Sequence, residues 1–277
     1  MPIGICKLCH LSKDLRDSHY LPRSIYKSDR AEQLTNKNPI VIGKTIRQDQ
    51  GQITDYVLCP DCEQLFSKNG ENWVLGKLPH DYGHAFPLQD ALVKETPVYI
   101  GAGVNLYAGA KFPAFDMDKL VYFAASIFWR GAVHEWESDR GEKTPKVDLG
   151  IHEEPIRKFL LGQGPFPADA WLTTIIYQFK PVLNVAYVAA PIHAGGWKRY
   201  WFYVHGLGFI LHFGSGVPEE IRLRCSQHTV ERVVMIENDF SNFVKELTNK
   251  MIKESDTSGL ADMLKEIEKI RGKKPGS

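Results

Sequence analysis

Cysteine is scarce in this chain of 277 residues, and no apolar run reaches the length of a membrane span. Neither sign of charge dominates, because 34 Lys and Arg face 33 Asp and Glu. This balance excludes a bulk electrostatic attraction to nucleic acid. Residues 1–5 show no basic or apolar leader pattern, so we expect a cytoplasmic protein without membrane contact. The content of 43% hydrophobic and 24% charged residues is typical of a folded globular protein.

Four of the five cysteines form two Cys-x-x-Cys pairs, one at residues 6–9 and one at residues 59–62. Two such turns supply four thiolates, which is the donor set of a tetrahedral structural zinc site. We therefore expect one Zn²⁺ to be bound by Cys6, Cys9, Cys59 and Cys62. Unrelated buried thiols and a redox pair are the alternatives, whereas Cys225 lies in an apolar stretch typical of a buried thiol.

Residues 6–10 also read C-x-x-C-H, the attachment motif of c-type haem. Attachment of this haem requires export, and the first residues carry no export signal. The zinc interpretation is therefore preferred, and His10 is expected to be exposed.

The segment between the cysteine pairs contains two runs of β-branched residues, at 39–47 and 52–58, with a turn at 49–51. We expect these runs to form a hairpin that leads into the second cysteine pair, and a short helix to follow it. Knuckle, hairpin, knuckle and helix is the order of a treble-clef zinc finger. In this order Glu63 lies at a helix N-terminus, where a carboxylate is favoured and can face a cation.

The remaining residues predict a second, larger unit. The strongest helix pattern covers residues 116–136, and a shorter one covers 155–161. Runs rich in β-branched and aromatic residues predict an antiparallel sheet from 170–179, 183–190, 199–205, 208–213 and 232–236. Two helices are expected within 239–252 and 258–271, before a polar tail. The fold class is α+β, with a zinc module at 1–80 and a helix-plus-antiparallel-sheet domain at 81–277.

The segments around both knuckles resemble a divergent member of the His-Asn-His (HNH) endonuclease superfamily, over roughly residues 5–75. In that superfamily the first knuckle is usually followed by Asp-His-Ile-x-Pro, and residues 18–22 here read Ser-His-Tyr-Leu-Pro. The second knuckle is usually followed by Asn or His, and here by Glu63. The resemblance implies a treble-clef fold with a catalytic metal beside a structural zinc.

The same resemblance assigns roles to two residues. His19 takes the position of the general base that activates water, and Glu63 that of a ligand for Mg²⁺ or a similar ion. The chain departs from the pattern at Ser18, where the usual Asp would be a metal ligand. Asp17, Asp55 and Asp61 are candidates to replace that ligand, and Asp55 is also a candidate for the place of the central Asn.

We therefore expect a metal-dependent endonuclease that hydrolyses phosphodiester bonds in DNA or RNA. The alternatives are a non-catalytic zinc-binding adaptor for nucleic acid or protein, and a protein-interaction module with a protein partner or a second copy. The chain also resembles an uncharacterised group of bacterial proteins through residues 19–23, 58–67 and 123–130. Zinc-knuckle nucleases of this type occur in bacterial defence and mobile elements.

Other polar and aromatic residues receive structural interpretations. Arg130 is expected to form a network with His134 and Glu137. His80 and His84 are four residues apart, a spacing that could bind a metal on one face of a helix. The neighbouring Pro79, Gly83 and Pro87 argue against a helix, so a loop is preferred. Aromatic side chains at 197–209 are interpreted as sheet packing, with stacking on nucleic-acid bases as the alternative.

Overall fold

The computed structural model describes residues 1–26, 40–42, 45–47, 52–79, 86–101, 103–177, 186–192 and 196–237. His80, His84 and the two helices expected within 239–271 lie outside these described residues. Among the described residues, no helix combines the length and the apolar character needed to cross a membrane.

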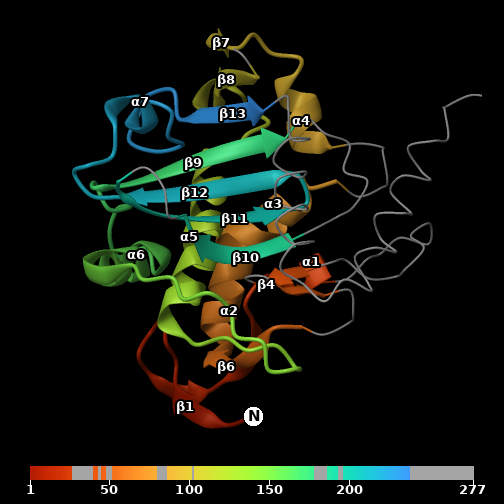
Figure 1. The fold of residues 1–277 in the computed structure, drawn as a ribbon. Helices are drawn as coiled ribbons and strands as arrows, with labels where there is room; N and C mark the ends of the chain where they lie inside the picture. The colour runs from red at the N-terminus through yellow and green to blue at the C-terminus, as the bar shows by residue number, and fades with distance from the viewer. Residues whose placement is uncertain are drawn as a thin grey trace, which may run out of the picture.

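A nine-stranded mixed sheet organises the molecule (Figure 1). Its strand order is β5-β4-β10-β11-β12-β9-β13-β8-β7. The centre is antiparallel, as predicted, whereas β4 runs parallel to β10 and β13 runs parallel to β9. The strands are β4 Ile40–Ile42, β5 Thr45–Arg47, β7 Tyr99–Gly101, β8 Val104–Ala108, β9 Ala170–Tyr177, β10 Ala186–Pro191, β11 Lys198–Val204, β12 Leu207–Phe213 and β13 Val233–Glu237.

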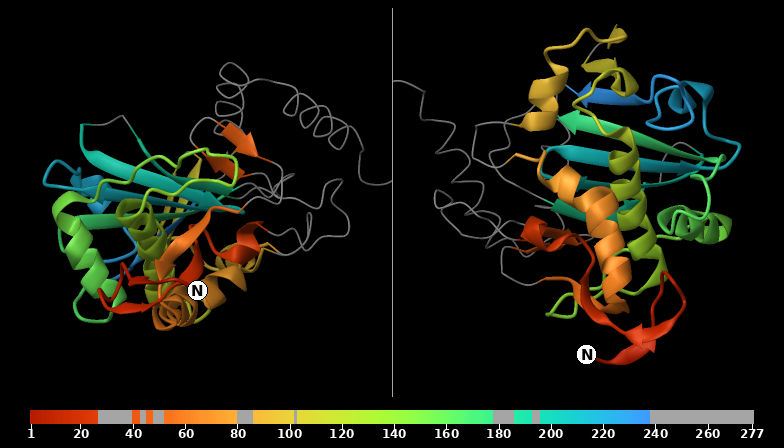
Figure 2. Two further views of the ribbon diagram at one scale, coloured as in Figure 1. Left: turned by 90° about the horizontal axis from the view of Figure 1, so that it is seen from below. Right: turned by 180° about the vertical axis from the view of Figure 1, so that it is seen from behind.

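The predicted long helix is α5, Met117–Val133, and it crosses one face of this sheet. Asp116 caps its N-terminus by accepting a hydrogen bond from the Lys119 backbone N–H at 3.1 Å. The right-hand view of Figure 2 shows α5 beside α2, Pro60–Phe66, over the same face. Because α5 packs on the sheet and on the α2 segment, nearly its whole circumference is buried.

Alternation along the strands separates the two sheet faces. Phe202 and Phe209 are cross-strand partners whose stacked rings lie 4.9 Å apart, and both rings pack against Phe123 of α5. The opposite face carries a smaller cluster that includes Tyr177 and Tyr203, which are 6% and 2% exposed. This burial supports the packing interpretation of the aromatic residues.

The predicted hairpin of residues 39–47 and 52–58 is wrong. Strand β6, Thr54–Leu58, pairs with β3, Arg16–His19, instead. The other run folds on itself as β4 and β5, and β4 extends the main sheet beside β10. Ile40 and Ile42 are thereby buried in the main core, which accounts for the different partner.

The first cysteine pair lies between β1, Ile3–Ile5, and β2, Ser12–Asp14. The described residues between α3 and η2 include α4, β7 and β8. One hydrophobic core includes residues from both predicted units. The separate folding of residues 1–80 therefore stays a prediction. The remaining elements are α1 Arg23–Tyr26, η1 Ser67–Glu71, α3 Asn72–Leu75, α4 Pro87–Leu92, η2 Gly109–Lys111, η3 Gly150–His152, α6 Glu153–Leu160 and α7 Glu219–Arg222.

Candidate metal centre

The four paired cysteines converge on one point, and their Sγ atoms all lie within 4.8 Å of one another. Cys6, Cys59 and Cys62 are buried, and Cys9 is partly exposed. Sulfurs bound at about 2.3 Å to a tetrahedral ion lie roughly 3.8 Å apart. The distance of 3.9 Å between the Sγ atoms of Cys9 and Cys59 fits this value. The cluster could therefore hold a metal ion such as zinc.

Local backbone geometry brings the two pairs together. In the first knuckle the His10 N–H donates to the Cys6 carbonyl at 2.8 Å, and His10 adopts a left-handed φ of 61°. In the second, Cys59 is the N-cap of α2, so the first helical turn carries Cys62 back toward it. The Cys59 N–H donates to the Cys6 Sγ at 3.3 Å and joins the two knuckles directly.

The clustered thiols shift one another's pKa values strongly. A hydrogen bond from Cys62 is the main cause that lowers the pKa of Cys6 to about 4. That same bond, with burial and the neighbouring negative charge, raises the pKa of Cys62. Crowded sulfurs resist carrying several negative charges at once, and a bound divalent cation removes this repulsion. The chemistry of the donor set therefore fits zinc.

His19 lies at the end of β3 and is partly exposed. Its Nε2 atom forms a hydrogen bond with the Oε1 atom of Gln52, and its ring lies 6.1 Å from that of Tyr26. This contact with Gln52 fixes the orientation of the imidazole.

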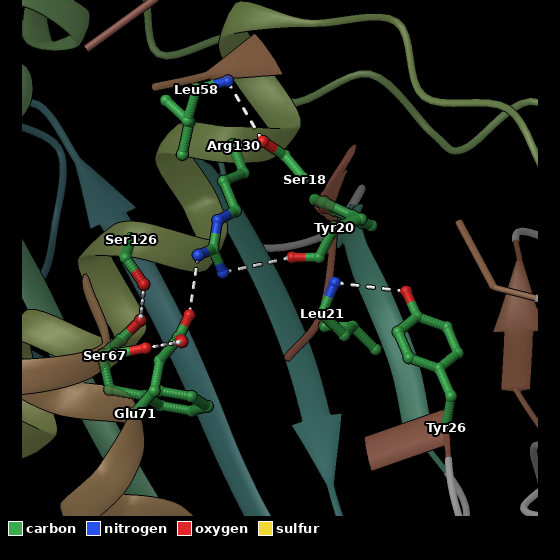
Figure 3. Close-up of polar contacts among 10 residues, drawn as sticks. Ser18, Tyr20, Leu21, Tyr26, Leu58, Ser67, Glu71, Ser126 and Arg130 are labelled. Carbon is green, nitrogen blue, oxygen red and sulfur yellow. Dashed lines mark hydrogen bonds and ion pairs between the residues drawn. The ribbon is translucent and has the colours of Figure 1, made fainter. Parts of the chain in front are cut away.

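Ser18 links the paired strands β3 and β6 through its side chain. Its Oγ atom accepts a hydrogen bond from the Leu58 N–H at 3.0 Å, and the residue is 1% exposed (Figure 3). A side chain used in this way holds β3 against β6 at the register shift beside Arg16. Ser18 thus offers no replacement for the carboxylate of the HNH pattern.

Glu63 lies in the first turn of α2, directly after the second knuckle. Its Oε1 atom is shielded from solvent and has no hydrogen-bond partner. No hydrogen bond or ion pair joins Glu63 to His19 in the part of the chain that the structure describes. Its charge instead acts on Arg130. Burial alone lowers the pKa of Arg130, but the charges of Glu71 and Glu63 raise it above the ordinary value.

Arg130 is the centre of a buried polar network that includes Glu71 and the Tyr20 carbonyl (Figure 3). It is 1% exposed, and its Nη2 atom donates to Glu71 at 2.7 Å. Its Nη1 atom donates to the Tyr20 carbonyl at 3.5 Å, and the guanidinium lies 4.6 Å from the centre of the Phe66 ring. The π-helical turn η1 places Glu71 there, with Ser67 donating to its other oxygen.

The expected network of Arg130 with His134 and Glu137 is wrong. Arg130 pairs with Glu71, and His134 pairs with Asp55 at 2.7 Å. Sequence analysis missed Glu71. No local signal marked it, because it lies in a run of polar and small residues, after Asn69 and Gly70 and before Asn72.

Two of the candidate replacement carboxylates already have partners. Asp55 faces His134, and Asp61 forms an ion pair with Lys13 at 2.6 Å. Within the described ranges, no second group of three or more His, Cys, Asp or Glu side chains is close enough to hold a metal.

The residue next to His19 connects three parts of the fold. The Tyr20 ring stacks on Trp136 at 5.5 Å, and its hydroxyl accepts a hydrogen bond from the Ala189 N–H at 3.2 Å. Gly131 of α5 lies so close that a Cβ atom there would be 2.5 Å from the Tyr20 hydroxyl. Tyr20 therefore joins the β3 end to α5 and β10.

Comparisons with protein-family models, with curated proteins and with solved structures give no match to this chain. Its own residues thus define it as a mixed α/β protein with a four-cysteine cluster that could hold a metal ion such as zinc.

Proposed function

We propose that this protein is a zinc-stabilised, metal-dependent endonuclease of the HNH type, acting on DNA or RNA. The observation that carries the proposal is the position of His19. It lies on β3, β3 pairs with β6, and β6 runs into the second knuckle and α2. This succession supports a treble-clef arrangement in which the strand pair and the helix surround the reaction site.

In this proposal the imidazole of His19 removes a proton from the attacking water. The contact with Gln52 orients the ring, so that one ring nitrogen is held and the other is left for the water. Glu63 would provide an oxygen ligand for Mg²⁺, which stabilises the charge that develops on the scissile phosphate. The cysteine cluster would bind structural Zn²⁺ and fix the start of α2.

The proposed setting is the cytoplasm, where reducing conditions keep the four thiols available for metal. Nucleic acid is the proposed partner. Of the basic residues near His19, Lys13 is already paired with Asp61, whereas Arg16 and Arg23 lie on exposed positions of β3 and α1. A role in bacterial defence belongs to the same proposal.

A plasmid-nicking assay in the presence of Mg²⁺ tests the activity. The zinc-loaded wild type should nick supercoiled DNA, and His19→Ala should reduce the rate by about 100-fold or more, as for loss of a general base. His10→Asn is the matched control, because His10 is exposed and Asn tolerates its left-handed φ. Equal nicking by wild type and His19→Ala would rule out this role.

The second candidate function is a non-catalytic zinc-binding adaptor. Two observations favour it: the hydroxyl of Ser18 is engaged with the backbone, and Glu63 is shielded beside the charge of Arg130. An adaptor would bind nucleic acid or protein without cleavage, with or without Mg²⁺. Binding by the wild type together with no nicking under any divalent cation would select this function.

A further inference from the structure

The hairpin of β1 and β2, which carries the first cysteine pair, projects from one end of the molecule (Figure 1). Its two strands form a separate sheet, and within the described residues no third strand pairs with the outer edge of β1. An edge strand offers unpaired backbone groups to another chain. The outer edge of β1 is therefore open to an added strand.

The hydrogen bonds between the two strands determine which backbone groups of β1 point outward. The Leu15 N–H donates to the Pro2 carbonyl at 2.9 Å, and the Cys6 N–H donates to the Leu11 carbonyl at 3.0 Å. Bonded and unbonded pairs alternate along an antiparallel ladder, so Gly4, midway between these two pairs, also bonds to β2.

Ile3 and Ile5 occupy the alternate positions, opposite Asp14 and Ser12. The backbone groups of such unbonded pairs point away from the partner strand. Each of the two isoleucines therefore presents one N–H donor and one C=O acceptor at the outer edge of β1.

The side chains at this edge are apolar and exposed. Ile3 is 77% exposed, Ile5 58%, and the nearby Leu11 55%. Edge strands are commonly protected against pairing by a charged side chain, a proline or a bulge. The three residues of β1 include no charge and no proline, and their register with β2 is regular. The edge is therefore unprotected.

Two copies of this edge fit each other in one antiparallel register. With Gly4 of each copy at a two-fold axis, Ile3 lies opposite Ile5 of the second copy, and Ile5 lies opposite Ile3 of the second copy. Each outward N–H then meets an outward C=O. The isoleucine side chains of both copies share one face, where they form cross-strand pairs. Such self-complementarity is what a two-fold interface requires.

The rest of the hairpin holds this edge in place. Cys6 and Cys9 lie in the turn between the strands, and the Cys6 Sγ atom accepts a hydrogen bond from the Cys59 N–H at 3.3 Å. The inner face of β1 rests on Leu15, whose Cδ1 atom would lie 2.7 Å from a Cβ atom at Gly4. A preformed edge loses little conformational freedom when a second strand is added.

We infer that two copies of this chain associate through β1, with Ile3 and Ile5 of each copy paired to those of the other. The two hairpins then form one four-stranded sheet. Strands of three residues cover much less than the roughly 1,600 Å² that a standard interface buries, so the dimer is weak and depends on concentration. The inference does not depend on the proposed endonuclease activity.

Sedimentation velocity of the full zinc-loaded chain, from about 1 to 300 µM, tests the association across micromolar dissociation constants. The wild type should pass from monomer to dimer as its concentration rises. Ile3→Pro removes an outward N–H without removing a bond to β2, and should weaken association more than tenfold. Ile3→Ser removes the apolar contact and should weaken it by about threefold to tenfold. Ile151→Asp, at an isoleucine of η3 that is 82% exposed, is the control and should associate as the wild type does.

The zinc content of each variant shows whether the first knuckle is intact. Ile3→Ser decides the case if Ile3→Pro loses zinc or fails to fold. The inference is overturned if the wild type stays a monomer over the whole range, or if the intact Ile3 variants associate as tightly as the wild type. Equal weakening by Ile151→Asp would also overturn it, because the effect would then not be specific to β1.

Discussion

At the scale of single residues, the most demanding feature is the burial of Arg130. A guanidinium loses its hydration on burial and must recover that cost from counter-charges and hydrogen bonds. Glu71, the Tyr20 carbonyl and the Phe66 ring supply them. Removal of one partner leaves the other charge uncompensated.

We therefore expect Glu71→Gln to lower the free energy of unfolding by about 3 kcal/mol, near the range for breaking one side of a buried ion pair. Arg130→Met should lower it similarly, because the charges of Glu71 and Glu63 would then lose the cation that both act on. Urea unfolding followed by tryptophan fluorescence measures both changes.

The control for this pair is Lys198→Met, which breaks an exposed ion pair with Asp148 of similar length, 2.6 Å. Its effect on stability should be small, because exposed pairs are weak. If Glu71→Gln is no more harmful than Lys198→Met, the buried network has no special role in stability.

At the scale of secondary-structure elements, η1 and α5 cross at a glycine, Gly70. A Cβ atom at Gly70 would lie 2.9 Å from the backbone nitrogen of Phe123, where the neighbour cannot turn aside. The two helices therefore approach to backbone contact at this point.

We expect Gly70→Ala to lower the free energy of unfolding by about 1–3 kcal/mol or more, as overpacking does. Gly164→Ala is the comparison, because its nearest neighbour would be Lys158 at 3.9 Å, an ordinary contact. Denaturant unfolding of both variants measures the difference. An unchanged stability of Gly70→Ala would mean that the helices separate easily here.

Elements with strong internal periodicity were predictable from the sequence. The apolar spacing that predicts α5 and the β-branched runs that predict β9 and β12 are confirmed. Strand partners were less predictable, because a pattern of period two identifies a strand without identifying its neighbour. The pairing of β6 with β3 therefore escaped prediction.

In the candidate site, too, the features set by local sequence were predictable and those set by the fold were not. The cysteine cluster follows from two local motifs, each only four residues long. Arg130 and Glu71 are 59 positions apart, and His134 and Asp55 are 79 apart. No local pattern joins such residues, so only the fold reveals these pairs.

At the scale of the whole molecule, the cysteine cluster belongs to the same core as the central sheet. Cys6, Cys59 and Cys62 are among the buried residues of that core. A metal bound there stabilises more than its own knuckles, because the start of α2 also positions η1 against α5.

We expect the purified chain to contain one zinc per molecule and to lose it to a strong chelator. The melting temperature should then fall by about 10 °C or more, since a structural zinc is worth several kcal/mol and each shifts melting by about 2–4 °C. Elemental analysis and scanning calorimetry measure the two quantities.

Cys225→Ser is the matched control, because Cys225 lies outside the cluster and should leave the zinc content unchanged. Cys6→Ser should lose zinc. A chain that contains no stoichiometric zinc when purified without added metal would contradict the site.

The buried contacts of Tyr20, the residue after His19, determine which substitutions the protein tolerates. Its ring and hydroxyl contact Trp136, Gly131 and Ala189. All three residues lie far from β3, the strand of His19, in the sequence. The position of the His19 imidazole therefore depends on these buried contacts of Tyr20. On the role proposed for His19, substitutions at these remote positions should impair function as readily as substitutions at the surface around His19, and a mutational scan of activity would measure both.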